Sequence, residues 1–384
     1  MKLTRQLRCA VLLASIFLYT GIGLAAQRVL IPEPPALAAK AYFLTDFDSS
    51  KVLAEHNADE RLAPASLTKI MTAYVAFQEL KDGNISLEDR VTISEKAWKT
   101  LGSRMFIEVN KQVEVEKLLK GVIISSGNDA SVALAEHIAG NESTFADLMN
   151  QTAERLGMFG THFVNSMGLP SPDHYSTARD LATLTRALIR DFPEYYEWHA
   201  IREFSFNNIT QQNRNKLLWR DSSVDGVKTG HTEGAGYCLV ASAKKGDMRL
   251  ISVVMGTKST AARASQNQAL LNYGFRFFVT QLLYTANEAL ARARIWKGQE
   301  KMLQLGLAED LYVTVPRRYL NDLQAKTEVS GKIMAPVSQG DTLGTLAILL
   351  GEQVYRTEPL TALEEIPLGS FFRQMYDKAL LFLE

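Results

Sequence analysis

Cysteine and net charge are both scarce in this chain, and each scarcity excludes a class of protein. Only two of the 384 residues are cysteine, and 42 Lys and Arg side chains balance 42 Asp and Glu. Without a basic excess, or a basic stripe interleaved with aromatic residues, we expect no nucleic-acid partner. The six histidines are scattered, with no H-x-x-x-H or C-x-x-C spacing, so we expect no metal site.

The first residues of the chain are typical of a targeting segment. Residues 9–24 carry no charge, follow three basic residues and end among small residues up to Ala26. This pattern predicts a cleaved signal peptide over residues 1–26, with Ala38 as a second possible cleavage point. A retained anchor is the alternative, although the run is short for a span of roughly 20 residues. Cleavage would leave Cys238 as a lone cysteine, predicted to be a buried hydrophobe without a disulfide.

Two kinds of hydrophobic period divide the rest of the chain. Strand patterns stand near both ends of residues 38–282, and helical patterns lie between and after them. The predicted strands cover residues 41–44, 52–54, 224–228, 237–243 and 250–255, and the predicted helices 67–78, 115–124, 129–139, 144–156, 178–190 and 265–278, with most of 85–200 helical. Strands from both ends of one region, with helices between them, predict an α/β or α+β sandwich.

Two further segments follow the sandwich. Residues 283–366 carry short alternating stretches and turns, which predict a small all-β domain. Residues 367–384 contain an amphipathic helix whose apolar face includes Phe371, Phe372 and Leu383. Such a helix can lie in a membrane interface. Docking of the helix on the β domain is the alternative, and the composition of its polar face leaves both open.

Three short polar clusters carry the chemistry. In chain order they are Ser66-Leu67-Thr68-Lys69, Ser126-Gly127-Asn128 and Lys228-Thr229-Gly230. Each cluster alone is a weak signal, because Ser242 to Lys245 and Ser265 to Asn267 repeat two of the spellings in the wrong context. The ordered set of three indicates a serine enzyme that catalyses acyl transfer.

The first cluster pairs a nucleophile with a base. Serine three residues before lysine on a helix puts both side chains on one face. Lys69 could then accept the Ser66 proton, provided that its amine is neutral. Burial and a nearby cation both lower a lysine pKa, and we expect Lys228 to be that cation. A helix cap beside a solvated lysine is the alternative for this pair alone.

The second cluster is predicted to relay protons. The Ser126 hydroxyl would stand between Lys69 and the leaving nitrogen, and Asn128 would orient Lys69 and bind a substrate amide. An ordinary N-cap turn is the alternative, because Ser, Gly and Asn are common there.

The third cluster suits recognition of a terminal carboxylate, through a cation and a hydroxyl. Gly230 would let substrate backbone approach the strand closely. Adjacent strand residues face opposite sides, so Lys228 and Thr229 share a site only if the strand is bulged or lies at an edge. A surface turn is the alternative.

At these motifs the chain resembles the penicillin-binding proteins of the D-alanyl-D-alanine carboxypeptidase type. The resemblance covers most of residues 38–280 and includes Pro64 to Lys69, Ser126 to Ala130, Tyr175 to Leu181, Asn213 to Asn215, Asp225 to Thr232 and Gly274 to Phe278. It implies a β-lactamase/transpeptidase-like fold for the sandwich. The β region and the last helix resemble the C-terminal domain and peripheral membrane anchor of that family.

The resemblance also implies roles for the matching residues. The implied catalytic residues are Ser66 as nucleophile, Lys69 as its base, and Ser126 and Asn128 as the proton relay. The implied substrate-binding residues are Lys228, Thr229, Gly230, His231 and Arg214. Among these, the backbone N–H groups of Ser66 and His231 would form the oxyanion hole.

The implied reaction removes the terminal D-alanine from a peptidoglycan stem peptide, through a Ser66 acyl-enzyme and without a cofactor. β-Lactams would acylate the same serine and inhibit the enzyme. With the signal peptide and the terminal helix, the resemblance implies secretion to the periplasm and peripheral attachment to the outer face of the inner membrane.

Three other functions stay open. A class A-like β-lactamase shares the clusters but adds a glutamate in an E-x-x-x-N segment. Glu194 and Glu197 lack that asparagine, which disfavours rapid lactam turnover. A non-catalytic cell-wall scaffold would keep the pocket without the chemistry, and the intact clusters argue against it. D,D-endopeptidase action on cross-links uses the same acyl chemistry, so the sequence does not separate it from carboxypeptidase action.

Overall fold

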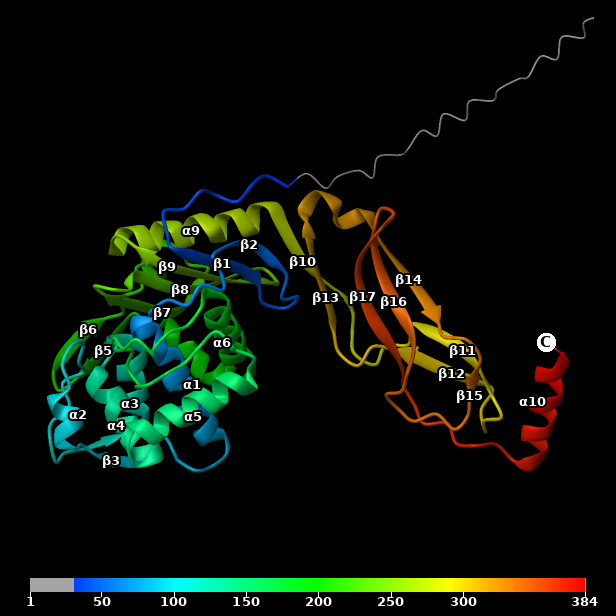
Figure 1. Ribbon diagram of the computed structural model, residues 1–384, viewed down its shortest axis with the longest axis horizontal. Coiled ribbons are helices and arrows are strands. Elements are labelled where there is room, and N and C mark those ends of the chain that lie inside the picture. The colour runs from blue at the N-terminus through cyan, green and yellow to red at the C-terminus, as the bar shows by residue number, and fades with distance from the viewer. Residues whose placement is uncertain (1–30, 384) are drawn as a thin grey trace, which may run out of the picture.

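The computed structural model describes residues 31–383. They form two lobes: the first contains most of the helices, and the second consists mainly of β-strands (Figure 1). The predicted signal peptide, residues 1–26, lies outside the described residues. Within residues 31–383, no helix has the length and apolar character needed to cross a bilayer.

A five-stranded antiparallel sheet forms the centre of the first lobe. Its order is β2-β1-β9-β8-β7, and the strands are β1 (Ala41–Asp46), β2 (Val52–His56), β7 (Val224–Thr232), β8 (Gly236–Lys245) and β9 (Met248–Thr257). The N-terminal hairpin joins the sheet where β1 pairs with β9, with Phe43 opposite Val253. Strands from both ends of the region therefore complete one sheet, as predicted. β7 lies at its edge.

Helices lie on both faces of this sheet (Figure 1). Helix α9 (Thr260–Phe277) packs on one face, where Leu270 and Leu271 join a buried cluster with sheet residues. The other helices of the lobe are α1 (Lys69–Lys81), α2 (Glu95–Lys99), α3 (Val115–Lys120), α4 (Asn128–Ala139), α5 (Glu142–Arg155), α6 (Ala178–Asp191), α7 (Pro193–Tyr196) and α8 (Leu217–Arg220). Helix α1 is buried from Lys69 to Phe77. This arrangement confirms the predicted sandwich.

The region from 85 to 200 is less helical than predicted. Strands β3 (Arg90–Thr92) and β4 (Gln112–Glu114) pair there, and residues 157–177 form a long irregular loop. The helix predicted over 115–124 changes after Lys120 into a π-helical turn, η2 (Gly121–Ser125). Hydrophobic periodicity missed these loops because side chains such as Asp129 and Asn165 bind their backbone N–H groups.

The second lobe is all β, as predicted. Strand β10 (Phe278–Tyr284) pairs with β13 (Leu311–Pro316), so its first strand follows α9 directly. A six-stranded sheet has the order β14-β16-β17-β12-β11-β15, formed by β14 (Leu323–Val329), β16 (Thr342–Leu350), β17 (Gln353–Ala362), β12 (Met302–Gly306), β11 (Ala291–Trp296) and β15 (Ile333–Met334). Its own core includes Ile295, Leu305 and Ile348.

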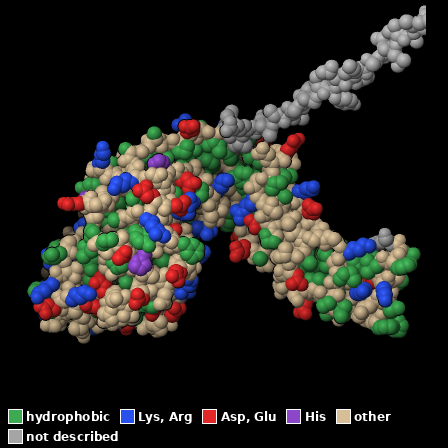
Figure 2. Space-filling view, in the orientation of Figure 1, with side chains coloured by type: hydrophobic (Ala, Val, Ile, Leu, Met, Phe, Trp, Pro, Cys, Tyr) green, Lys and Arg blue, Asp and Glu red, His purple; other side chains and the backbone are tan. Residues whose placement is uncertain are grey.

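The last helix, α10 (Phe371–Leu383), lies at the end of the β lobe farthest from the first lobe (Figure 1). Its polar side contacts that lobe, because the buried Asp377 carboxylate accepts a hydrogen bond of 2.7 Å from the Lys297 backbone N–H. Its apolar side faces outward, with Phe372 84% and Phe382 93% exposed. Hydrophobic side chains gather at this end of the molecule in Figure 2.

Candidate active site

Ser66 and Lys69 lie one turn apart at the start of the buried helix. Residues Ala65–Thr68 form a 3-10 turn, η1, that leads directly into α1. Pro64 precedes this turn, where its restricted φ favours helix initiation. Lys69 Nζ lies 3.2 Å from Ser66 Oγ, and Lys69 is only 1% exposed. The structure therefore brings the predicted pair together and excludes a solvated lysine.

Lys69 has two further partners, and both are carbonyl oxygens. Its Nζ donates to Asn128 Oδ1 at 2.8 Å and to the Met167 backbone oxygen at 2.7 Å. Asn128 Nδ2 donates to Leu101 O at 2.7 Å. This bond orients the side-chain amide so that its oxygen, Oδ1, faces Lys69. A neutral amine has two N–H groups and one lone pair, so these two acceptors leave the lone pair for the Ser66 hydroxyl.

The site lowers the pKa of Lys69 to about 7. Burial is the largest cause, and the Arg214 guanidinium adds to it, whereas the Asp129 and Glu142 carboxylates oppose it. Lys228, the cation that we expected beside Lys69, does interact with it: burial and then the Lys69 charge hold the pKa of Lys228 well below its ordinary value. Arg214 is a second cation that acts on Lys69, which the sequence did not indicate.

Ser126 lies at a sharp bend that follows η2. Its φ of 60° and ψ of 35° place it in the left-handed region, which is uncommon for a residue with a side chain. Gly127, not Ser126, is the N-cap of α4, and no side chain caps that helix. Lys228 Nζ instead donates to Ser126 Oγ at 2.9 Å. The ordinary N-cap turn is therefore excluded, and π-helical turns such as η2 are frequent at functional sites.

The edge position of β7 explains how two adjacent residues reach one site. β7 pairs with β8 alone, and its register shifts between Val224 and Gly226. The long Lys228 side chain extends to Ser126 and also binds the carbonyl of Thr229 at 3.2 Å. Thr229 itself lines the cavity at the site. Of the two conditions that the sequence allowed for a shared site, the edge position holds at Lys228 and Thr229, whereas the register shift lies before them.

Gly230 is required for a reason that the sequence did not show. A Cβ at this position would lie 2.8 Å from the Pro64 backbone oxygen and 3.3 Å from Ala65 Cβ. The absence of a side chain thus lets β7 pack closely against the turn that carries Ser66. Gly230 also lines the cavity, where a substrate could approach it. That a substrate approaches the strand closely at this residue stays a prediction.

A cavity of about 410 Å³ joins the three clusters. Its lining is rich in cationic and hydroxyl groups and contains no carboxylate. The lining residues are Ser66, Ser103, Ser126, Gln212, Asn213, Arg214, Lys216, Thr229, Gly230, His231, Tyr237, Thr260 and Arg263. The exposed His231 ring stacks on Tyr237, with ring centroids 3.9 Å apart. A cavity with this lining is suited to an anionic ligand.

Arg263 and the Met167 carbonyl are the site groups that sequence reasoning missed. Arg263 comes from the first turns of α9, and its Nη1 donates to the Gly230 backbone oxygen at 3.0 Å. It is buried and lies over the Tyr237 ring. An arginine on a helix and a backbone oxygen in a loop belong to none of the three motifs, so no spacing could have predicted either.

The structure also bears on the β-lactamase alternative. An E-x-x-x-N segment does occur between Ser126 and Lys228, from Glu203 to Asn207, although we had disfavoured rapid lactam turnover because Glu194 and Glu197 lack the asparagine. Both end residues are exposed on the β5–β6 hairpin (Glu203–Phe206 and Ile209–Gln212), and neither lines the cavity. The position of this glutamate, and not the absence of the motif, therefore argues against rapid lactam turnover.

Cys238 is a buried free thiol in β8, as predicted, and burial raises its pKa. In the part of the chain that the structure describes, no group of three or more His, Cys, Asp or Glu side chains is arranged to hold a metal ion.

Comparison with known proteins identifies the family that the sequence motifs resemble. The family model described as D-alanyl-D-alanine carboxypeptidase matches residues 28–259, and that of the penicillin-binding protein 5 C-terminal domain matches residues 278–368. The chain belongs to the D-alanyl-D-alanine carboxypeptidase family. It is 45% identical over 372 residues to D-alanyl-D-alanine carboxypeptidase DacC of Escherichia coli, covering 95% of this chain and 92% of DacC.

Solved structures of penicillin-binding proteins are similar to this chain. Penicillin binding protein 5 from Haemophilus influenzae has 40% sequence identity and a TM-score of 0.85, covering 88% of this chain and 99% of that one. Penicillin-binding protein D2 from Listeria monocytogenes, solved in its ampicillin-bound form, has 28% identity and a TM-score of 0.59, covering 63% of this chain and all 100% of that one.

Proposed function

We propose that this protein is a serine-type D-alanyl-D-alanine carboxypeptidase that acts on peptidoglycan stem peptides. The observation that carries the proposal is the Ser66 hydroxyl beside a Lys69 amine whose N–H groups are held by two carbonyl oxygens. Ser66 Oγ gives its proton to Lys69 and bonds to the carbonyl carbon of the terminal peptide bond. The C–N bond then breaks, the leaving D-alanine nitrogen takes a proton, and an ester to Ser66 remains.

The proton for the leaving nitrogen comes by way of Ser126. Its hydroxyl accepts from Lys228 at 2.9 Å and lines the same cavity as Ser66, so it can donate to the nitrogen and be reprotonated from the lysines. Asn128 keeps Lys69 oriented during this exchange. Water then attacks the ester, with Lys69 again as base, and hydrolysis restores the Ser66 hydroxyl.

The substrate carbonyl oxygen is stabilised by backbone N–H groups. Ser66 lies in the first helical turn, where N–H groups lack intrahelical partners and the helix dipole favours negative charge. His231 on the edge strand supplies the second donor in this proposal. The oxyanion hole therefore uses backbone atoms, and the exposed His231 ring takes no part in the chemistry.

The terminal carboxylate of the substrate is held by the cationic part of the cavity. Thr229, Arg214 and Arg263 line it together, and Lys228 lies behind Thr229. Burial lowers the pKa of both arginines, and an anion beside them would offset the unfavourable burial of their charge. This charge favours a substrate with a free carboxylate.

Penicillin labelling tests the function directly. Mass spectrometry of the intact chain after benzylpenicillin treatment should show one adduct, and digestion should place it on Ser66. We expect the adduct to decay over minutes or longer, because no glutamate lines the cavity to activate water. Turnover in milliseconds would instead indicate a β-lactamase, and an adduct on another side chain would refute the proposed site.

The terminal helix supports a proposal about location. The outward apolar side of α10, with Phe371, Phe372 and Phe382 exposed, suits insertion into a membrane interface, while Asp377 holds its polar side on the β lobe. With the predicted signal peptide, this arrangement favours a periplasmic enzyme held at the outer face of the inner membrane.

Deletion of residues 370–384 tests the attachment. The truncated protein should leave the membrane fraction and keep its activity on a soluble pentapeptide. The residues that line the cavity all belong to the first lobe, whereas α10 lies at the opposite end of the β lobe (Figure 1). Phe372→Asp with Phe382→Asp should have the same effect in the full chain, and Lys378→Ala serves as the matched control. Unchanged membrane association of the truncated protein would show that the helix is not the anchor.

A further inference from the structure

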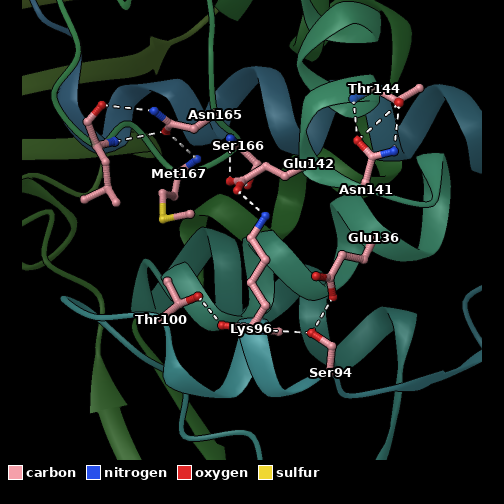
Figure 3. Close-up of polar contacts among 12 residues, drawn as sticks. Ser94, Lys96, Thr100, Glu136, Asn141, Glu142, Thr144, Asn165, Ser166 and Met167 are labelled. Atoms are coloured by element: carbon pink, nitrogen blue, oxygen red, sulfur yellow. Dashed lines mark hydrogen bonds and ion pairs between the residues drawn. The ribbon is translucent and has the colours of Figure 1, made fainter.

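The backbone carbonyl of Met167 accepts a hydrogen bond from Lys69. Met167 lies in a loop that is bonded around Asn165, and Figure 3 shows both residues. Asn165 Oδ1 accepts from the backbone N–H groups of Met167 at 3.3 Å, Gly168 at 2.7 Å and Leu169 at 3.0 Å. These bonds fold the segment around one side chain. As a result the Met167 oxygen is directed at Lys69 Nζ, 2.7 Å away.

Two helices hold the residue just before Met167. Glu142, the first residue of α5, accepts from the Ser166 backbone N–H at 3.2 Å and from Ser166 Oγ at 2.9 Å through the same oxygen, Oε1. Thr72 of α1 donates to the Ser166 backbone oxygen at 2.5 Å. Since α1 also carries Lys69, the contact with Thr72 fixes the loop relative to the base. Of the two side chains that hold Ser166, Glu142 is the charged one.

The second carboxylate oxygen of Glu142 faces a lysine from a third helix. Lys96 Nζ of α2 lies 3.0 Å from Glu142 Oε2, and the Glu142 side chain is 13% exposed against 57% for Lys96. Figure 3 marks this ion pair with a dashed line. A chain of polar contacts thus runs from a surface lysine through Glu142 and Ser166 to the base of the active site.

The charges that face Lys69 come from several elements. Arg214 and Lys228 are the cations on the cavity side, and Asp129 of α4 and Glu142 of α5 are the carboxylates. His174 in the loop is neutral, because burial above all lowers its pKa to about 4. Glu142 therefore offsets the cations, and Lys96 in turn offsets Glu142.

We propose that Glu142 is a positioning residue for Lys69, acting through Ser166 and the Met167 carbonyl, with Lys96 as the counter-ion that limits the charge Lys69 senses. The proposal deepens the function above and rests on it. Because neutral Lys69 is the base, the charge on Glu142 raises the pH at which acylation begins. The exposed Lys96 makes that pH sensitive to a residue remote from the substrate.

The test is the pH dependence of benzylpenicillin acylation by the full chain, measured from pH 5 to 9. Glu142→Gln keeps an oxygen for Ser166 but removes the charge, so the acid limb should move to lower pH by about half a unit. At the acid end of the range the variant then reacts about threefold faster than the wild type. Lys96→Gln frees the Glu142 charge, so its acid limb should move to higher pH.

Lys99→Gln is the matched control. Lys99 lies on the same helix as Lys96 but pairs with Glu95, so its removal should leave the acid limb unchanged. Identical midpoints for wild type, Glu142→Gln and Lys96→Gln, or shifts of the two variants in one direction, would overturn the proposal. Lys96→Gln keeps the test valid if Glu142→Gln fails to fold. A wild type that is not acylated at Ser66 would refute the proposed function instead.

Discussion

Ser66→Ala is expected to abolish both D-alanine release from a pentapeptide and covalent labelling by penicillin. Removal of the nucleophile leaves the cavity and its cations in place, so the variant should still bind substrate. The loss in turnover should be about 10⁶-fold, as for other serine nucleophiles. The measurements are D-alanine release by the purified protein and the mass of the intact chain after penicillin treatment.

Ser265→Ala is a suitable control for this experiment. Ser265 begins the second S-x-N spelling of the sequence and lies exposed on α9, so full activity is expected. D-Alanine release that survives in Ser66→Ala would show that another residue is the nucleophile. A wild type that binds penicillin but releases no D-alanine would favour the scaffold alternative.

Lys69→Met should lower the acylation rate by about 10³-fold, the range for loss of a general base. The wild-type rate should rise as the pH passes through about 7, because the site lowers the Lys69 pKa to that value and the neutral amine is the active form. A depressed lysine pKa means that the proton is lost near neutrality, so the active form dominates above that pH. The variant has no amine at this position and should lack this rise.

Lys245→Met is the matched control for the base. Lys245 ends the second S-x-x-K spelling, is exposed at the end of β8 and lies over the Phe275 ring, 4.9 Å from its centroid. The Lys245→Met variant should be acylated by penicillin at the wild-type rate and with the wild-type pH profile. If Lys69→Met keeps the rise near pH 7, another group titrates there and the assignment of the base is wrong.

Most of the architecture followed from patterns within short stretches of sequence. The apolar spacing after Ser66 predicted the buried helix α1, and the alternation near residues 224–255 predicted the strands that include β7. The all-β second lobe and the terminal helix were also predicted correctly. These elements could be predicted because the period of their hydrophobic residues indicates which side of each element is buried.

The loops around the base were not readable in this way. Asn165, Ser166 and Glu142 fold the 165–169 segment through polar contacts that leave no hydrophobic period. Arg263 lies on a helix that was predicted to start later, and nothing in its neighbours indicates the cavity. For the same reason the sequence suggested only Lys228 as the cation near Lys69, whereas in the structure the Arg214 guanidinium also lowers the Lys69 pKa.

The sequence by itself determined the order of the three clusters, the turn that sets Ser66 beside Lys69, and the kind of chemistry they share. Only the tertiary structure decided that Lys69 meets Asn128, 59 positions away, and that Lys228 meets Ser126, 102 positions away. It also decided the burial and neighbouring charges that make Lys69 a base near neutral pH. Local spacing records contacts within a helix turn or strand pair, whereas a pKa depends on the total field of groups that folding brings together.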